Sequence, residues 1–372
     1  MVAENASGRV TIFLAGDVMT GRGIDQILPC PSPPALQESY VADARAYVDL
    51  AEEANGAIPR GVDPAYIWGD ALGELERAAP DARIINLETS VTRSENRWNG
   101  KGIHYRMHPA NVPCLTAARI DVCALANNHV LDYDDAGLVE TLQTLAVAGV
   151  KTTGAGRDLA DAQRPAIIEL PGGRRVIVVS LGTETSGIPP EWAATGTRPG
   201  VDFLGNLSDA VAGEVTARVQ HVKRRGDVAV VSIHWGSNWG YAVPSAHVRF
   251  AHRLIDGGVD IVHGHSSHHP RPIEVYRRKL VLYGCGDLID DYEGIGGYEE
   301  FRNELALMYF PAIAGDTGHL LGLRMSPVRI HQMRLHRASA EQAEWLRETL
   351  TRVSRRFGSR VALTVDDQLV LA

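Results

Sequence analysis

Five apolar segments of this 372-residue chain each end in a short polar cluster that could bind a metal or transfer a proton. Short continuous apolar runs are typical of parallel strands that are buried on both faces. In open α/β sheets, ligands bind beyond the carboxyl ends of such strands. Because these ends carry carboxylates, amides and imidazoles, we expect a metal site with mixed oxygen and nitrogen ligands. The five clusters are Gly16-Asp17, Asn86-Leu87-Glu88, Asn127-Asn128-His129, His234-Trp235-Gly236 and residues 263–269.

The first two clusters supply carboxylates. Asp17 is preceded by Gly16, which permits a tight turn, and Arg22 follows with a guanidinium suited to a substrate oxyanion. The alternative interpretation is an aspartate that caps a helix and an arginine on the surface. Glu88 beside Asp17 would be costly unless a cation or a proton lay between the two carboxylates. We therefore interpret Asp17 as catalytic and metal-binding, Arg22 as catalytic, and Glu88 as a metal ligand.

The third cluster combines a metal ligand with a proton donor. Asn128 offers a neutral oxygen, and His129 is suited to act as a general acid or to stabilise a developing negative charge. Asp132 follows three residues later and is suited to orient the His129 ring. The alternative interpretation is a helix start that is capped by asparagine. We predict that Asn128 binds metal and that His129 and Asp132 are catalytic.

Histidines dominate the last two clusters. Four histidines fall within seven residues, a density that no structural need explains, and imidazole is a common metal ligand. We predict His265 and His268 as ligands and place His263 in the core. His234 ends a valine-rich run and is either a ligand or a buried core histidine. The composition after it suggests that Trp235 forms a pocket wall for the substrate.

A polar stretch over residues 92–109 has little periodicity and is predicted to be a loop. Its basic and aromatic side chains suit an anionic or carboxylate-bearing substrate, although a solvated basic loop would have the same composition. The predicted substrate-binding residues in this loop are Trp98, Lys101, His104 and Arg106.

The elements that must position these clusters alternate between strands and helices. The predicted strands are 9–18, 82–87, 122–126, 150–153, 175–181, 227–233, 260–262 and 279–282. The predicted helices are 36–55, 64–79, 135–148, 208–225 and 245–255. After residue 320 the pattern changes to strands at 320–325, 328–335 and 360–365 and a helix at 338–357. We interpret residues 9–310 as one α/β domain, which the C-terminal strands and helix of residues 311–372 complete.

Composition limits the classes of function. A net charge of −8 argues against a nucleic-acid partner. No apolar stretch approaches the roughly 20 residues that span a bilayer, and the N-terminus lacks the features of a signal peptide. The four cysteines show no paired spacing, which indicates reduced thiols. We predict a cytoplasmic protein without a membrane anchor, and the sequence leaves its oligomeric state open.

Taken in order, the clusters resemble the CapA family of poly-gamma-glutamate capsule synthesis proteins, which is related to calcineurin-like metallophosphoesterases. The resemblance covers most of residues 10–290. It implies a four-layer α/β/β/α sandwich, the calcineurin-like metallophosphoesterase fold, with a metal site at the strand ends. The motifs that carry it are Gly16-Asp17-Val18-Met19, Asn86-Leu87-Glu88, Asn127-Asn128-His129, His234-Trp235-Gly236 and Gly264-His265-Ser266-Ser267-His268.

The chain departs from the phosphoesterase pattern in its first two motifs. Met19 stands where those enzymes carry the histidine of Asp-x-His, and Glu88 replaces an aspartate. The resemblance therefore implies one strong metal position and a weak or empty second one, for Mn, Zn or Fe. The strong position would use Glu88, Asn128, His234 and His265, and the weak one Asp17, Glu88 and His268.

Three functions fit these residues. The first is metal-dependent hydrolysis of a phosphoester or of an amide or peptide-like bond of the poly-gamma-glutamate type, with a metal-activated water and His129 as general acid. The second is peptide epimerisation, with Asp17 and an imidazole of His265 or His268 on opposite faces of an α-carbon. The third is a non-catalytic polymer-binding protein. The two enzymatic readings imply a small-molecule or peptide substrate.

Overall fold

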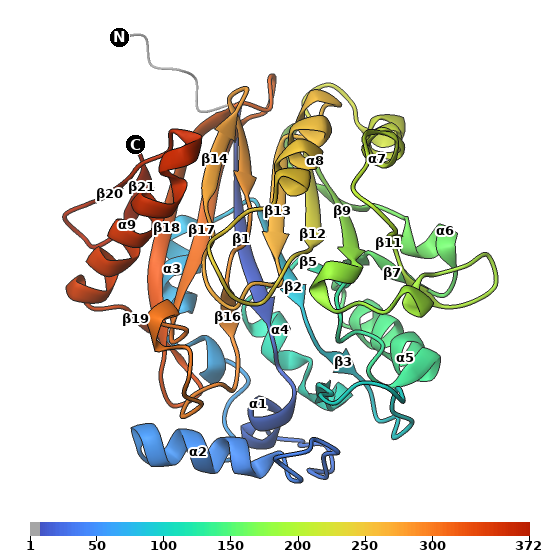
Figure 1. The fold of residues 1–372 in the computed structure, drawn as a ribbon, viewed down its shortest axis with the longest axis vertical. Coiled ribbons are helices and arrows are strands. Elements are labelled where there is room, and N and C mark those ends of the chain that lie inside the picture. Colours follow the sequence, from blue (N-terminus) through green and yellow to red (C-terminus); the bar gives the residue numbers. More distant parts are fainter. Residues whose placement is uncertain (1–7) are drawn as a thin grey trace.

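The strands of the computed structural model, which describes residues 8–372, form two large mixed sheets (Figure 1). The first sheet has ten strands and is built around β1 (Arg9–Val18). Three strands continue it in parallel with β1, namely β2 (Ala82–Leu87), β5 (Val122–Ala124) and β6 (Lys151–Thr153). Five strands extend its other side, namely β17 (Leu305–Ala314), β18 (Leu320–Ile330), β19 (Leu335–Arg337), β21 (Leu369–Leu371) and β20 (Val361–Leu363). The short strand β16 (Asp287–Ile289) runs parallel to the end of β1.

The second sheet has seven strands, and five of them are parallel, so their carboxyl ends lie at one edge. The parallel strands are β9 (Arg175–Thr183), β11 (Phe203–Leu204), β12 (Val228–His234), β13 (Ile261–His265) and β15 (Lys279–Leu282). The remaining strands, β8 (Ala166–Glu169) and β14 (Ile273–Tyr276), pair in the antiparallel direction. Two short ladders stand apart from both sheets, β3 (Ser90–Val91) with β4 (Arg106–Met107), and β7 (Ala155–Gly156) with β10 (Gly200–Val201).

Strand β1 shows how the layers are held together. Its side chains alternate between two faces, as the twofold period of a strand requires. Ile12 and Leu14 belong to a buried cluster that also contains Val178 and Val230 of the second sheet, so the two sheets share one core. Phe13 faces away from that core, into a cluster with helical side chains. The structure therefore confirms the α/β class.

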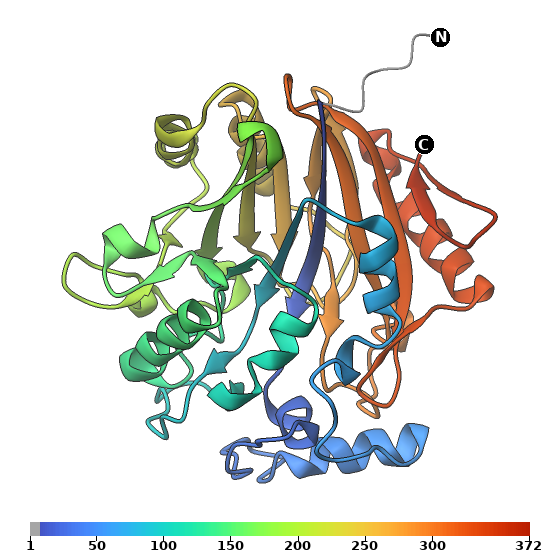
Figure 2. The same ribbon diagram turned by 180° about the vertical axis from the view of Figure 1, so that it is seen from behind.

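Helices cover the outer faces of the sheets, as the two opposite views show (Figures 1 and 2). Helices α7 and α8 supply buried apolar side chains to the outer core of the second sheet. The helices are α1 (Arg22–Ile27), α2 (Arg45–Asn55), α3 (Ala71–Ala78), α4 (Pro113–Ala117), α5 (Asp134–Val147), α6 (Leu159–Ala162), α7 (Asp209–Val222), α8 (Ser245–Asp256) and α9 (Ala340–Ser354). Within residues 8–372 every helix is too short or too polar to span a lipid bilayer. All four cysteines are free thiols.

Several predicted elements differ from the observed ones. The predicted helix 36–55 begins only at Arg45, and the predicted helix 64–79 is interrupted at Gly69, where φ is 44°. Strands β16 and β17 were not predicted, and the predicted strands 320–325 and 328–335 give way to one long strand, β18. Strands β17 and β18 each contain a proline, which weakens a strand prediction because proline lacks the amide donor.

The shared core between the sheets leads to a test of stability. Leu14 is fully buried in that core, so Leu14→Ala is expected to lower the free energy of unfolding by about 2–5 kcal/mol. The matched control is Leu159→Ala on α6. Leu159 is 38% exposed, so its truncation should lower the free energy of unfolding far less. Urea unfolding followed by circular dichroism measures both variants. Equal losses in the two variants would contradict the position of this core.

Candidate metal centre

The polar clusters predicted from the sequence come together where the parallel strands of both sheets end. Asp17 lies in β1, Glu88 directly after β2, and Asn128 in the turn that follows β5. His234 is the last residue of β12, and His265 is the last residue of β13. Four of these side chains are almost completely buried, and Asn128 is half-buried at their edge.

The two carboxylates from the first sheet are fixed by amide donors. Asn86 Nδ2 donates to Asp17 Oδ1 at 2.7 Å and to Glu88 Oε2 at 3.1 Å. Asn127 Nδ2 in turn donates to Asn86 Oδ1 at 3.0 Å. The backbone N–H of Ser266 donates to Asp17 Oδ2 at 3.1 Å, from a residue with a φ of 97°. This backbone angle is costly for serine, so the surrounding contacts must hold it in place.

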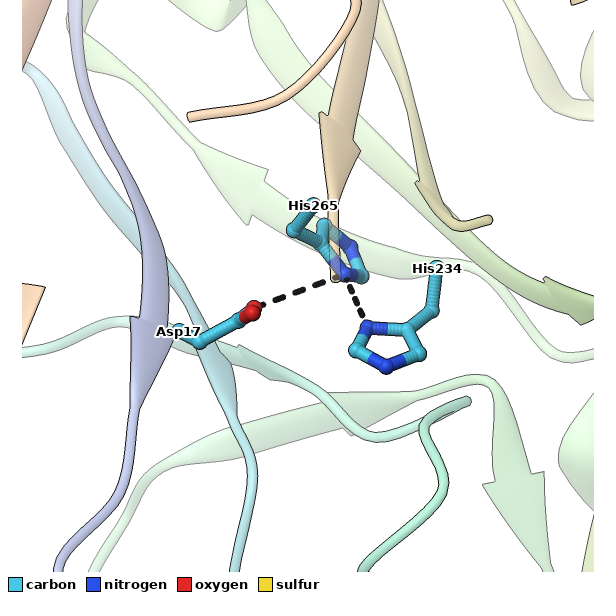
Figure 3. A group of neighbouring side chains, drawn as sticks. All are labelled: Asp17, His234 and His265. Atoms are coloured by element: carbon cyan, nitrogen blue, oxygen red, sulfur yellow. Dashed lines mark hydrogen bonds and ion pairs between the residues drawn. The ribbon is translucent and has the colours of Figure 1, made fainter. Parts of the chain in front are cut away.

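The two histidines of the second sheet face the same region. His234 Nδ1 lies 2.8 Å from His265 Nδ1, and His265 Nδ1 lies 3.8 Å from Asp17 Oδ1 (Figure 3). On its other side, His234 Nε2 lies 3.0 Å from Asn128 Oδ1 and 3.8 Å from Glu88 Oε1. Burial lowers the pKa of both histidines, so both rings stay neutral and keep a lone pair for a ligand.

Asp17 also belongs to a second group of possible ligands. His268 Nδ1 lies 2.8 Å from Asp287 Oδ2, and ligand atoms of Asp17, His268 and Asp287 all lie within 4.8 Å of one another. The same limit holds for Asp17, His234 and His265. Sequence reasoning missed Asp287, which stands opposite Asp17 in the β1–β16 pairing. One signal was present, because Gly286-Asp287 repeats the Gly16-Asp17 pattern after an apolar run.

The charges of this region fit a divalent cation. Burial and the nearby Asp287 raise the pKa of Asp17 to about 7, and burial and Asp17 raise the pKa of Glu88. Burial likewise raises the pKa of Asp287. Asp290 is also buried, and its Oδ2 has no hydrogen-bond partner within residues 8–372. Carboxylates gathered in this way repel one another. A cation among them would remove the electrostatic cost of burying them together. Carboxylate, amide and imidazole donors together suit Mn, Zn or Fe.

His129 lies at the edge of this group, and Asp132 holds its ring through Nδ1. Its Nδ1 lies 2.6 Å from Asp132 Oδ2, and its Nε2 lies 3.9 Å from Glu88 Oε1. The hydrogen bond to Asp132 assigns the ring proton to Nδ1, so Nε2 is a proton acceptor. Burial lowers the pKa of His129 to about 4, partly countered by Asp132. Lys101 Nζ lies 2.5 Å from Asp132 Oδ1 and 3.2 Å from His129 Nδ1, so Lys101 holds the carboxylate that orients the histidine, and its substrate role stays a prediction.

Arg22 has surroundings different from those predicted. Its Nε and Nη2 pair with Asp291 at 3.1 and 2.5 Å, and its Nη1 contacts Glu38 and Tyr47. The guanidinium is buried in these ion pairs, which anchor α1 to the segment after β16. The prediction that Arg22 offers a free fork to a substrate is therefore corrected.

Trp235 also differs from its predicted role. It is fully buried, its Nε1 donates to the Tyr283 carbonyl oxygen at 3.1 Å, and its ring stacks on His247. Because side chains alternate along the chain at a strand end, the residue after an inward-facing histidine points to the opposite side of the sheet. Trp235 is thus a core residue and not a pocket wall.

Two of the predicted substrate-binding residues contact backbone carbonyl oxygens in or near the loop. His104 Nε2 contacts the Trp98 carbonyl oxygen at 3.0 Å, and Arg106 donates to the carbonyl oxygens of Ser94 and Pro33. These contacts engage His104 Nε2 and both Nη groups of Arg106, and the substrate role of the two residues stays a prediction. Trp98 is half-buried and lines a small surface cavity, so its substrate role stays a prediction.

Comparisons with known proteins agree with the resemblance seen in the motifs. The family model described as bacterial capsule synthesis protein PGA_cap matches residues 11–292. A Mycobacterium tuberculosis protein named "Probable polyglutamine synthesis accessory protein" is 55% identical over 361 residues, which cover 97% of this chain and 95% of that protein. The PGA biosynthesis protein CapA of Bacillus subtilis is 28% identical over 313 residues, which cover 81% of this chain and 73% of that protein. This chain therefore belongs to the bacterial capsule synthesis protein family PGA_cap.

Proposed function

We propose that this protein is a metal-dependent hydrolase that cleaves an amide, peptide-like or phosphoester bond in poly-glutamate synthesis. The observation that carries the proposal is the position of Asp17 between two groups of possible metal ligands, with His129 at their edge. The printed names of the relatives, which refer to polyglutamine synthesis and PGA biosynthesis, support the biological setting. The shared core of two helix-covered sheets supports a four-layer sandwich of the calcineurin-like metallophosphoesterase type.

The donor atoms divide into two metal positions that share Asp17. The first would use Asp17 with His234 and His265, and Glu88 and Asn128 lie on the opposite side of the His234 ring, near Nε2. The second would use Asp17 with His268 and Asp287, and the carboxylate of Asp287 compensates there for the histidine that Met19 replaces. A divalent ion held in such a site supplies Lewis-acid activation of water and of a substrate carbonyl or phosphoryl oxygen.

His129 is positioned to move the proton in this reaction. Its Nε2 faces the ligand group without a proton of its own, because Nδ1 donates to Asp132. It would accept a proton from the attacking water and return it to the leaving group. Asp132 fixes the ring from the other side and stabilises the charged imidazolium that forms in between, and Lys101 in turn holds Asp132.

The distances do not favour epimerisation by the predicted pair. An α-carbon between an acid and a base on opposite faces needs about 6 Å between their reacting atoms, twice the reach of a hydrogen bond. Asp17 Oδ1 and His265 Nδ1 are 3.8 Å apart, and ligand atoms of Asp17 and His268 lie within 4.8 Å. Both pairs are thus spaced for one small ion and not for a peptide α-carbon.

Removing a ligand should remove the metal. We expect His265→Ala to lower the affinity for Mn or Zn at least about tenfold, because it deletes a buried nitrogen donor. The control is His221→Ala, which changes an exposed histidine on α7 and should keep the metal. Metal content after equilibrium dialysis measures the effect. A wild-type protein that retains no Mn, Zn or Fe would contradict the proposal, as would equal retention by His265→Ala.

The raised pKa of Asp17 predicts how stability depends on pH in the metal-free protein. Asp17 has a pKa of about 7 in the folded protein against 3.8 for an unperturbed aspartate, so between these values the folded state binds the extra proton. The free energy of unfolding should therefore fall as the pH rises from about 4 to about 7. Thermal melts in a chelating buffer should show a weaker fall in Asp17→Asn. The control Asp135→Asn, at an exposed position, should behave as wild type.

His129 should be needed for turnover and not for metal binding. We expect His129→Gln to keep its metal and to lose about 10²–10⁴-fold in kcat, the usual contribution of a general acid or base. Hydrolysis of phosphodiester, phosphomonoester and gamma-glutamyl test compounds by metal-loaded protein measures this, with His221→Gln as control. Undiminished turnover in His129→Gln would exclude its role. A metal-loaded wild type that is inactive on all three compounds would favour a polymer-binding protein.

A further inference from the structure

A second cleft lies far from the metal centre, on the outer face of the ten-stranded sheet. It has a volume of about 740 Å³ and opens between α3 and strands β1, β17, β18 and β21. Figure 2 shows α3 lying across this face of the sheet. Arg9 is the first residue of β1 and lines the cleft, whereas Asp17 lies near the other end of the same strand. The cleft is therefore separate from the metal centre.

The cleft is positively charged in a protein whose net charge is −8. Four arginines line it, and only two acidic side chains accompany them. Such a local excess of positive charge attracts anions that the rest of the surface would repel. The charged residues of the cleft are Arg9, Arg77, Arg324, Arg337, Glu74 and Asp366.

Three of the arginines are gathered around a single buried carboxylate. The Glu74 side chain is only 3% exposed and forms an ion pair with Arg77. Arg324 Nη1 and Arg337 Nε each lie 3.7 Å from a Glu74 carboxylate oxygen. One carboxylate cannot neutralise three guanidinium groups, so positive charge remains. Arg324 is held further by Gln368 Oε1 at 2.8 Å, which keeps this charge in a fixed place.

Three of the four arginines, Arg9, Arg77 and Arg337, present donors to the solvent. The side chains of Arg77 and Arg337 are 58% and 50% exposed. Arg9 donates from Nε to Thr11 Oγ1 at 3.3 Å, and its two Nη groups have no protein partner within residues 8–372. Arg77 gives one Nη group to Glu74 and Arg337 gives one to the Asp366 carbonyl oxygen, and the remaining N–H groups can each bind a carboxylate. The cleft thus offers several separate carboxylate-binding points.

The floor of the cleft is apolar and extended. Phe310 and Leu323 line it between the arginines, and the Arg324 guanidinium lies 4.3 Å from the centre of the Phe310 ring. A compact phosphate site would instead use backbone N–H groups at the start of a helix. Here α3 contributes Arg77 and Ala78 from its last turn, where carbonyl oxygens and not amides are free.

We propose that this cleft binds an acidic peptide segment. Its carboxylates pair with Arg9, Arg77 and Arg337, and the methylene groups of its side chains rest on the apolar floor. This binding needs neither the metal nor His129, so it stands independently of the hydrolase proposal.

Titration calorimetry of the full chain with hexa-L-glutamate tests the proposal, at low salt and with a chelator that removes metal. Wild type should bind in a saturable manner, and Arg77→Gln and Arg337→Gln should each weaken the affinity about tenfold, because each removes a charge-assisted hydrogen bond. The control is Arg249→Gln, which changes an arginine on α8 that is equally exposed at 58% and lies outside the cleft. Melting curves check that each variant is folded.

The possible results distinguish an acidic-peptide site from a phosphate site and from no site. Loss of affinity in the two cleft variants with unchanged affinity in Arg249→Gln supports the acidic-peptide site. No saturable binding to wild type, or equal affinities in all variants, overturns it. Tighter binding of inorganic phosphate or triphosphate than of hexa-L-glutamate would also overturn it, in favour of a phosphate site. The hydrolase proposal would be unaffected by any of these results.

Discussion

The burial of several carboxylates around Asp17 is the constraint on which the account of this protein depends. An unpaired carboxylate in a protein interior is strongly disfavoured, and Glu88 and Asp287 add repulsion to that penalty. Hydrogen bonds from Asn86 and Ser266 offset only part of it. A proton or a cation among the carboxylates would relieve this repulsion, and we propose a cation. The neighbouring neutral imidazoles and the amide of the half-buried Asn128 are further candidate ligands.

The two sheets make this arrangement rigid. One set of candidate ligands comes from the first sheet and the other from the second, so a metal site here requires that the sheets do not shift against each other. His263 Nε2 lies 2.8 Å from the Ala15 carbonyl oxygen across the interface, and Ser232 Oγ contacts the rings of both His263 and His265. Ligands on strands that are locked in this way are held more accurately than ligands on loops. The fold therefore fixes the geometry before any ion binds.

The sequence predicted the positions of strand ends better than the directions of side chains. Asp17 and His265 were found because an apolar run that stops at a polar residue marks the end of a buried strand. Asp287 was missed because β16 has only three residues, too few for a pattern. Arg22 was misread because its partner Asp291 is 269 residues away, a contact that no local pattern contains. Trp235 was misread because composition does not tell on which face of a strand end a side chain lies.

The most direct test is a crystal structure of the protein with Mn²⁺, with anomalous scattering used to locate the ions. The account predicts an anomalous peak between Asp17, His234 and His265, and a second peak between Asp17, His268 and Asp287. In a crystal with Zn²⁺ instead, carboxylate and imidazole atoms should lie about 2.0–2.2 Å from the ion. Data that show these side chains in the same places with no peak among them, or with peaks only elsewhere on the molecule, would contradict the central claim.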